Sequence, residues 1–311
     1  MRNGALAGVV AVLITAVLWG TTGTAATLAP GVGPLAMGAA ALGVGGILQG
    51  LIALPALRRE RARLAAARPV VIAGALGVAI YPLAFYSSMH LAGVAIGTVV
   101  SLGSAPIASG LLERILERRR LGPAWQAAAV LGIAGAAVLC AAKLGQAPEE
   151  LGATAAGVGL GLVAGVTYAL YSWGAHRLMG QGIGRAAAMG SIFGLGGAAL
   201  LPVLVLTGAP LLATPQAFAV GAYMALVPMF LGYVLFGFGL TRIAPSTATT
   251  LTLAEPAVAA VLAVAVVGER LPALGWAGLA AICASILVVG LSSGRSAADV
   301  PTPSEAPIGA R

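Results

Sequence analysis

The stretch Thr252-Leu-Ala-Glu-Pro256 decides how this chain folds, because it repeats a pattern that first occurs as Leu102-Gly-Ser-Ala-Pro106. The two prolines lie 150 residues apart, about half of the 311-residue chain, and each motif sits inside a long apolar run. Such spacing indicates a duplicated membrane protein, and duplication of this kind is typical of transporters. Only the second copy carries a carboxylate, Glu255, where the first has Ala105.

The composition requires a lipid environment. The chain is 59% hydrophobic and 8% charged, whereas a soluble domain carries about 25% charged residues. The net charge of +8 comes from arginines in the short gaps between apolar runs, which is not the basic stripe of a nucleic-acid-binding protein. Cys140 and Cys283 belong to apolar runs, so neither a disulfide framework nor a metal site is expected.

Ten apolar runs are long enough to cross about 30 Å of hydrocarbon, which predicts an all-α membrane protein. The first run exceeds the roughly 7–15 residues of a signal-peptide core, so we interpret it as a retained helix. The predicted spans are 4–27, 33–57, 70–90, 93–113, 123–142, 152–175, 186–207, 216–240, 245–267 and 272–292.

Arginine placement predicts the orientation of these spans. With the N-terminus in the cytoplasm, 15 of the 17 basic residues fall on the cytoplasmic side, mainly in 58–68 and 114–120. Only Lys143 and Arg270 fall outside. Because cytoplasmic loops carry an excess of positive charge, both termini are expected to be cytoplasmic.

Further sequence matches between the two halves support the duplication: Ala7-Gly8-Val9 with Ala156-Gly157-Val158, Glu117-Arg118 with Glu269-Arg270, and Trp125 with Trp276. Each half holds five predicted helices, and five is odd, so the second half must enter the membrane from the opposite face. We therefore expect two inverted five-helix repeats. The expected division is a first repeat at 1–142, an outer loop at 143–151, a second repeat at 152–292 and a disordered cytoplasmic tail at 293–311.

Glu255 is the strongest functional candidate. It lies ten residues into its predicted span, about 15 Å deep, and is expected to be the only acidic residue deep in any span. An ionised carboxylate at that depth is costly, so it should face the protein interior, be paired or be protonated. Two interpretations stay open: a hydrogen-bonded carboxylate that locks the helix near Pro256, or a group that binds a substrate amine or couples transport to protons.

Other polar and aromatic residues within the spans are weaker candidates for substrate binding than Glu255. Tyr168 and Tyr171 lie near the end of a predicted span and are more typical of interface anchors. His90 and His176 are far apart in depth, so no metal site or other cofactor is expected. The expected substrate-binding set is Trp19, Tyr81, Phe85, Ser88, Thr98, Ser101, Thr252 and Glu255.

Pro106 and Pro256 occupy equivalent positions in the two halves. Each proline removes a backbone donor and tends to kink its helix. The pair is expected to form symmetric gating kinks that face a common centre, or else only to shape helix packing.

These residues resemble the EamA-type ten-helix exporters of the drug/metabolite transporter superfamily. The resemblance implies two inverted five-helix repeats, a central cavity surrounded by helices 3, 4, 8 and 9, and helices 1, 2, 6 and 7 as moving walls. It also implies export of amino acids, other metabolites or drugs from the cytoplasm across the bacterial inner membrane. The features that carry it are Trp19-Gly20, Ala244-Pro-Ser-Thr-Ala248, Leu253-Ala-Glu-Pro256, Gly268-Glu269, and Trp276 with Gly278.

The chain also departs from the family pattern. Ala105 replaces the glutamate of the first Glu-Pro pair, and the first helix lacks a membrane glutamate. The family's amino-acid exporters with known fold have an aromatic-rich cavity. This chain has only 16 aromatic residues (four Trp, six Tyr and six Phe), so it is not expected to share their specificity for a broad range of aromatic solutes.

The sequence thus favours a secondary transporter of small metabolites whose partners are its solute and the lipid bilayer. Multidrug efflux is an alternative. An intramembrane enzyme is disfavoured, because Ser109 has no histidine at its depth and one glutamate cannot form a catalytic dyad. A scramblase or another non-transport membrane component is a further alternative that we do not favour. A homodimer stays open, since small-residue stripes such as Gly157-xxx-Gly161-xxx-Gly165 suit packing within or between chains.

Overall fold

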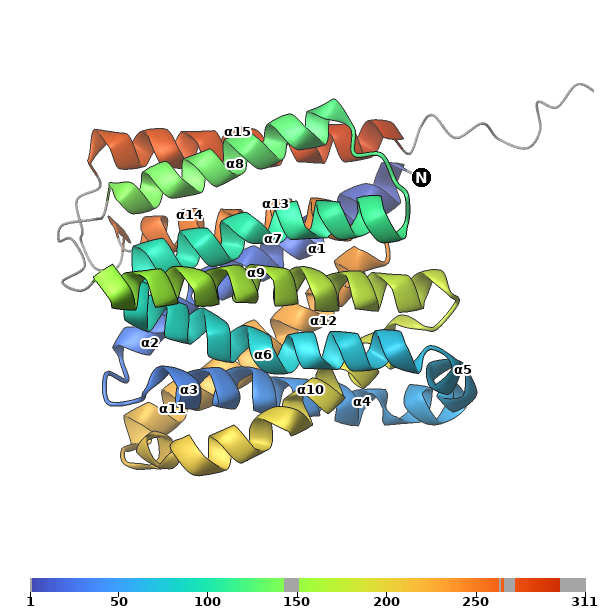
Figure 1. Cartoon of the computed structure of the whole chain (residues 1–311), viewed down its shortest axis with the longest axis horizontal. Helices are drawn as coiled ribbons and strands as arrows, with labels where there is room; N and C mark the ends of the chain where they lie inside the picture. The colour runs from blue at the N-terminus through green and yellow to red at the C-terminus, as the bar shows by residue number, and fades with distance from the viewer. Residues whose placement is uncertain (1, 143–150, 263, 266–271, 297–311) are drawn as a thin grey trace, which may run out of the picture.

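A computed structural model describes residues 2–142, 151–262, 264–265 and 272–296. The elements in these ranges are helical, and the long helices run roughly side by side along the bundle (Figure 1). Within these ranges nine helices are long and apolar enough to cross a membrane. They are Gly4–Thr27, Pro34–Arg59, Arg68–Ala92, Ile96–Leu116, Pro123–Ala141, Gly152–Gly180, Arg185–Thr207, Pro215–Leu240 and Ala273–Leu291.

The first half of the chain builds five of these spans. Gly93, at a backbone φ of +84° that favours glycine, makes the tight turn between the third and fourth. The elements are α1 (Arg2–Gly20), α2 (Thr22–Thr27), α3 (Pro34–Gly38), the π-helical η1 (Ala39–Val44), α4 (Gly45–Arg59), α5 (Arg61–Ala66), α6 (Arg68–Ala92), α7 (Val94–Leu116) and α8 (Pro123–Ala141).

The second half follows a similar order. Its elements are α9 (Leu151–Gly180), α10 (Arg185–Thr207), η2 (Ala209–Leu212), α11 (Pro215–Met224), the π-helical η3 (Ala225–Leu231), α12 (Gly232–Leu240), α13 (Pro245–Leu251), α14 (Ala254–Leu262) and α15 (Ala273–Ser296). The last helix continues four residues beyond the predicted end at 292. Most of the expected outer loop at 143–151, including Lys143, lies outside the described residues, as do Arg270 and the tail from 297; Leu151 already belongs to α9.

The predicted span 245–267 is two short helices instead of one. The helix is interrupted at Thr252-Leu253, between α13 and α14. Pro256 has no N–H to donate to the carbonyl of Thr252, and Glu255 N–H donates to that carbonyl instead, over 2.9 Å. By contrast, α7 runs unbroken through Pro106. The two proline motifs therefore do not adopt the same backbone, which corrects the expectation of symmetric kinks.

Glycines let α4 and α10 approach each other closely. A Cβ atom at Gly197 of α10 would lie 2.7 Å from the carbonyl oxygen of Gly43 and 2.8 Å from the amide nitrogen of Ile47. In lipid, such close backbone contact replaces the hydrophobic drive that packs helices in water. The α4–α10 pair lies on one side of the bundle, and α8 packs against α15 on the other (Figure 1).

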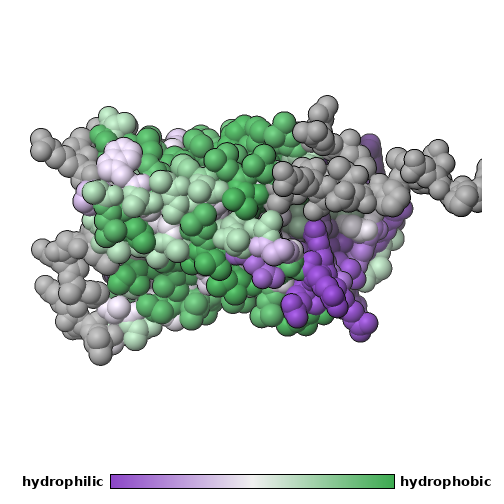
Figure 2. Space-filling model, turned by 90° about the horizontal axis from the view of Figure 1, so that it is seen from above, coloured by the Kyte–Doolittle hydropathy of each residue, from purple (hydrophilic) through white to green (hydrophobic). Residues whose placement is uncertain are grey.

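The polar residues gather at one end of the bundle. The turn around α5 and the connections α7–α8, α9–α10 and α12–α13 lie at this end, on the right of Figure 1. Figure 2 shows apolar surface along the length of the bundle and hydrophilic residues towards the same end. We call it the arginine-rich end, after Arg63, Arg119, Arg185 and Arg242. Its cytoplasmic location stays a prediction.

Candidate functional site

A small cavity lies where the first, second, third, eighth and ninth predicted spans meet. About 20 Å³ is open to water, room for a single molecule. Glu255 is the only charged residue among its lining side chains. The lining residues are Trp19 and Thr22 (α1, α2), Ala41 and Leu42 (η1), Tyr81, Pro82, Phe85 and Tyr86 (α6), Met229 (η3), Tyr233 (α12) and Glu255 (α14).

The family-based expectation for this cavity is met only in part. The third, eighth and ninth spans line it as expected. No residue of α7, the fourth span, is among its lining residues, whereas α1, α2 and η1 from the first two spans are. The first two spans therefore form part of the cavity wall itself.

The helix break places Glu255 in the first turn of α14. A carboxylate is favourable there, at the positive end of the helix dipole. The residue is 8% exposed, and among the described residues no side chain or backbone group forms a hydrogen bond or ion pair with its carboxylate. The contact that would lock the helix, one of the two interpretations of Glu255, is therefore absent from the described residues, and the carboxylate faces the cavity.

Aromatic rings surround the cavity, although the chain has only 16 aromatic residues. Trp19 and Tyr233 have ring centroids 4.9 Å apart, and Tyr81 stacks on Phe85 at 5.5 Å. Nine of the 16 aromatic residues form one connected cluster: Trp19, Tyr81, Phe85, Tyr86, Tyr168, Tyr171, Phe193, Tyr233 and Phe236. The distribution of rings, not their number, makes this cavity aromatic.

Tyr168 and Tyr171 are fully buried in this cluster, so their interpretation as interface anchors is wrong. The hydroxyls of Tyr171 and Tyr233 lie 2.6 Å apart. Tyr168 Oη is 2.9 Å from Thr252 Oγ1. Because the Thr252 hydroxyl donates to the carbonyl of Thr249, Tyr168 is the donor to Thr252.

The structure brings four of the eight predicted binding residues to the cavity: Trp19, Tyr81, Phe85 and Glu255. Thr252 lies outside the lining and bonds to Tyr168. Three further polar or aromatic lining residues, Thr22, Tyr86 and Tyr233, were not in the expected substrate-binding set. Tyr86 could have been found from its neighbour Phe85 on the same helix, but no local signal marks Tyr233.

The other three predicted residues lie elsewhere. Ser88 donates to the carbonyl of Gly157 over 2.7 Å and so fastens α6 to α9. Thr98 Oγ1 is 3.4 Å from Met89 Sδ. Ser101 is buried, and its hydroxyl has no hydrogen-bond partner among the described residues. These three residues do not line the cavity.

Two π-helical segments border the cavity. η1 supplies Ala41 and Leu42, and η3 supplies Met229. The Trp19 indole N–H donates to the carbonyl of Pro228 within η3, over 2.9 Å. π-Helical turns occur frequently at functional sites because they interrupt regular helix geometry. The helices that line the cavity therefore contain three irregular segments: η1, η3 and the break before Glu255.

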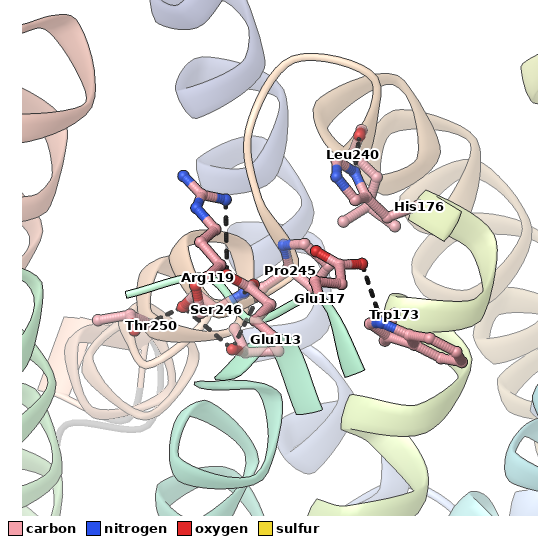
Figure 3. A network of polar contacts seen from close by, with 10 residues as sticks. Glu113, Glu117, Arg119, Trp173, His176, Leu240, Pro245, Ser246 and Thr250 are labelled. Carbon is pink, nitrogen blue, oxygen red and sulfur yellow. Dashed lines mark hydrogen bonds and ion pairs between the residues drawn. The ribbon is translucent and has the colours of Figure 1, made fainter. Parts of the chain in front are cut away.

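A second buried carboxylate, Glu113, lies in α7 and was missed by the sequence analysis. Its side chain is fully buried although it lies in the last turn of α7, so two carboxylates, Glu113 and Glu255, are buried among the described residues. Glu113 Oε1 accepts the backbone N–H of Ser246 at 2.7 Å (Figure 3). Ala244 at the start of α13 has no side-chain acceptor, and Pro245 has no N–H. Glu113 thus caps α13 from another helix.

Further polar contacts join neighbouring helices around Glu113 at the arginine-rich end (Figure 3). Arg119 Nη1 lies 3.5 Å from Glu113 Oε2. Trp173 of α9 donates to Glu117 over 3.0 Å. His176 Nδ1 is 2.7 Å from the carbonyl of Leu240. Together these contacts connect α7, α9, α12 and α13.

The sequence model of the EamA-like transporter family matches residues 6–141 and 155–291. A protein named "Uncharacterized transporter YwfM" from Bacillus subtilis (strain 168) is 34% identical over 279 residues, which cover 89% of this chain and 92% of that protein. A "Probable terminal-alkyne amino-acid exporter" from Streptantibioticus cattleyicolor is 26% identical over 289 residues, 90% of this chain and 92% of that protein. A crystal structure with 21% identity superposes with a TM-score of 0.70 over 94% of this chain and 98% of its own, a likeness that shows the fold alone.

Proposed function

Because the chain belongs to the EamA-like transporter family, we propose that it is a secondary transporter of the bacterial inner membrane that exports small amine-bearing metabolites, such as amino acids. The observation that carries this proposal is the carboxylate of Glu255, which faces an aromatic cavity without a partner from the described residues. A solute ammonium group would supply the partner that this carboxylate lacks among the described residues.

The chemistry of the cavity favours a cation. Its lining includes five aromatic side chains and one carboxylate but no lysine or arginine. Aromatic faces attract ammonium groups, more strongly where water is excluded. The name of the S. cattleyicolor relative, an amino-acid exporter, supports the same class of solute. The same lining would also accept an apolar cationic drug, which keeps multidrug efflux as the alternative.

The proposed architecture is ten crossings in two inverted five-helix repeats. The two regions that match the family, 6–141 and 155–291, support two copies. The α13–α14 pair would supply the tenth crossing, in addition to the nine long helices. An odd number of crossings per copy would invert the second copy, and the arginine-rich end would face the cytoplasm together with both termini.

Transport would proceed by alternating access. The cavity, with about 20 Å³ open to water, is too small for an amino acid, so the bundle must widen to admit one. The break at Thr252-Leu253 and the two π-helical segments are where helices can bend without losing regular hydrogen bonds. The Glu113–Ser246 contact would have to open when the arginine-rich end admits solute from the cytoplasm.

Glu255 would couple export to proton entry. A proton and an ammonium group compete for one carboxylate, so the ionised form would carry the solute outward and the protonated form would return. Each cycle then exchanges one proton for one ammonium-bearing solute, without two separate sites.

The test is counterflow in proteoliposomes against a panel of labelled amino acids, amines, apolar cationic drugs and a carboxylic acid that lacks an amine. The proposal predicts accumulation of the amino acids and small amines and none of the carboxylic acid that lacks an amine. Accumulation of the drugs but not of amino acids would favour multidrug efflux. Lipid flipping without solute flux would favour a scramblase and contradict the proposal.

A further inference from the structure

A second cavity lies on another face of α12. Tyr233 lines the central cavity, whereas its neighbour Val234 lines this one. The volume open to water is about 60 Å³. The lining residues are Gln49, Ile52 and Ala53 of α4, Arg185, Ala186, Met189 and Gly190 of α10, and Val234 of α12. No residue lines both cavities. We call this space the lateral cavity.

Gln49 lines the lateral cavity and carries an unused hydrogen-bond donor. Its side chain is only 3% exposed, and the amide nitrogen has no hydrogen-bond partner among the described residues. A buried amide donor without a partner destabilises the folded protein. A ligand that accepts this hydrogen bond would remove the penalty.

Arg185 supplies positive charge to the same cavity. Its guanidinium lies 5.6 Å from the ring of Phe238, and Arg242 lies 3.5 Å over that ring. Arg119 at this end has a carboxylate partner, Glu113. Across the described ranges, neither Arg185 nor Arg242 forms an ion pair with a carboxylate. Two cations thus share one aromatic ring without a counter-charge from the described chain.

The start of α10 does not by itself explain these features. Glu60 already accepts the N–H of Gly184, with both oxygens at 3.1 Å. This carboxylate occupies the amide that precedes the helix and is not part of the cavity lining. The available donors of the lateral cavity are therefore the guanidinium of Arg185 and the amide of Gln49.

We propose that the lateral cavity binds a phosphate group, held by the Gln49 amide and the Arg185 guanidinium. Guanidinium groups match phosphate oxygens in geometry and charge, and the volume suits one phosphate group with little else. The remaining walls are apolar, and Ile52 and Ala186 are exposed on the bundle surface. Arg185 opens α10 at the arginine-rich end, where a membrane presents its head groups. The phosphate comes from a phospholipid or from free phosphate in solution.

The test measures binding and needs no transport assay, so it stands apart from the proposed function. The purified full chain is titrated in detergent with short-chain phosphatidylglycerol, with the matching diacylglycerol that lacks phosphate, and with inorganic phosphate. Binding is followed by native mass spectrometry and by the shift in melting temperature. The proposal predicts binding of phosphatidylglycerol or inorganic phosphate but not of diacylglycerol. Binding of the phospholipid alone assigns the source to lipid, and binding of inorganic phosphate assigns it to solution.

Three variants separate this site from general electrostatic attraction. Arg185→Gln and Gln49→Met, which keeps the length of the side chain but not the donor, should each weaken binding by about tenfold or more. Arg58→Gln removes an exposed arginine that does not line the cavity and should bind like the wild type. Equal binding by wild type and Arg185→Gln would overturn the proposal, and so would an equal loss in Arg58→Gln. If Gln49→Met does not fold, the comparison of Arg185→Gln with Arg58→Gln still tests the proposal.

Discussion

Glu113 and Ser246 lie 133 residues apart in the chain, yet the carboxylate of one accepts the backbone N–H of the other at 2.7 Å. Glu113 belongs to the first region that matches the family and Ser246 to the second. The contact therefore joins the two regions at the arginine-rich end.

Removing the Glu113 carboxylate should weaken this junction. Glu113→Ala leaves the N–H of Ser246 buried without an acceptor, which costs about 1–3 kcal/mol. Glu113→Gln keeps an acceptor oxygen and should lie between the wild type and Ala in melting temperature. Hydrogen exchange at the start of α13 should rise in the same order. Ser246→Ala retains the backbone N–H and is the matched control; an equal effect in that variant would contradict the role given to Glu113.

The hydroxyls of Tyr168 and Thr252 should be energetically coupled. Tyr168→Phe and Thr252→Val each break the bond of 2.9 Å between them. The double variant should therefore lose less stability than the sum of the single variants, by about 0.5–1.5 kcal/mol. Denaturant unfolding of the four proteins in detergent measures this cycle. Strict additivity would show that the bond contributes nothing to stability.

Trp19 should contribute through its indole N–H as well as its ring. Trp19→Phe leaves the Pro228 carbonyl without the donor it has now and removes part of the cavity wall. We expect a lower melting temperature and slower counterflow. Tyr86→Phe, which keeps its ring in the same lining, is the control. If Trp19→Phe matches the wild type in both measurements, the contact with η3 is dispensable.

The α4–α10 contact should not tolerate the methyl group that a glycine-to-alanine substitution adds. At Gly197 an added Cβ meets backbone atoms of α4, which cannot rotate away, so Gly197→Ala should sharply reduce the yield of folded protein. At Gly159 of α9, by contrast, an added Cβ would have no neighbouring atom within 4 Å. Gly159→Ala should be neutral or stabilise the helix by about 0.5–1 kcal/mol. Size-exclusion chromatography in detergent compares the two, and equal yields would refute the close packing.

The sequence was sufficient for the nine long helices among the described residues, because each needs only a long apolar run between breakers. It did not indicate the break at Thr252-Leu253 inside the predicted span 245–267. The predicted ends of the third span, 70 and 90, lie within two residues of α6 (Arg68–Ala92). Glu255 was also recognisable, since a carboxylate in the middle of an apolar run is costly wherever the run packs.

What the sequence could not supply was which distant residues meet. Glu113 is the last residue of the predicted span 93–113. Nothing near it in the sequence indicates its partner, because Ser246 comes from another helix. The rings of Trp19 and Tyr233 contact each other although they are more than 200 residues apart in sequence. The prolines show the same limit: the helix breaks at Thr252-Leu253, before Pro256, whereas α7 runs unbroken through Pro106.

Glu255 carries the central claim, and gradient-driven uptake tests it most directly. Three proteins are reconstituted in vesicles that are acidic inside: the wild type, Glu255→Gln and the control Glu117→Gln. The control keeps an acceptor for Trp173. The experiment follows uptake of a labelled amino acid that counterflow has identified as a solute. The account predicts accumulation by the wild type and the control and none by Glu255→Gln, with all three proteins folded by size-exclusion chromatography. Accumulation by folded Glu255→Gln at the wild-type rate would contradict it.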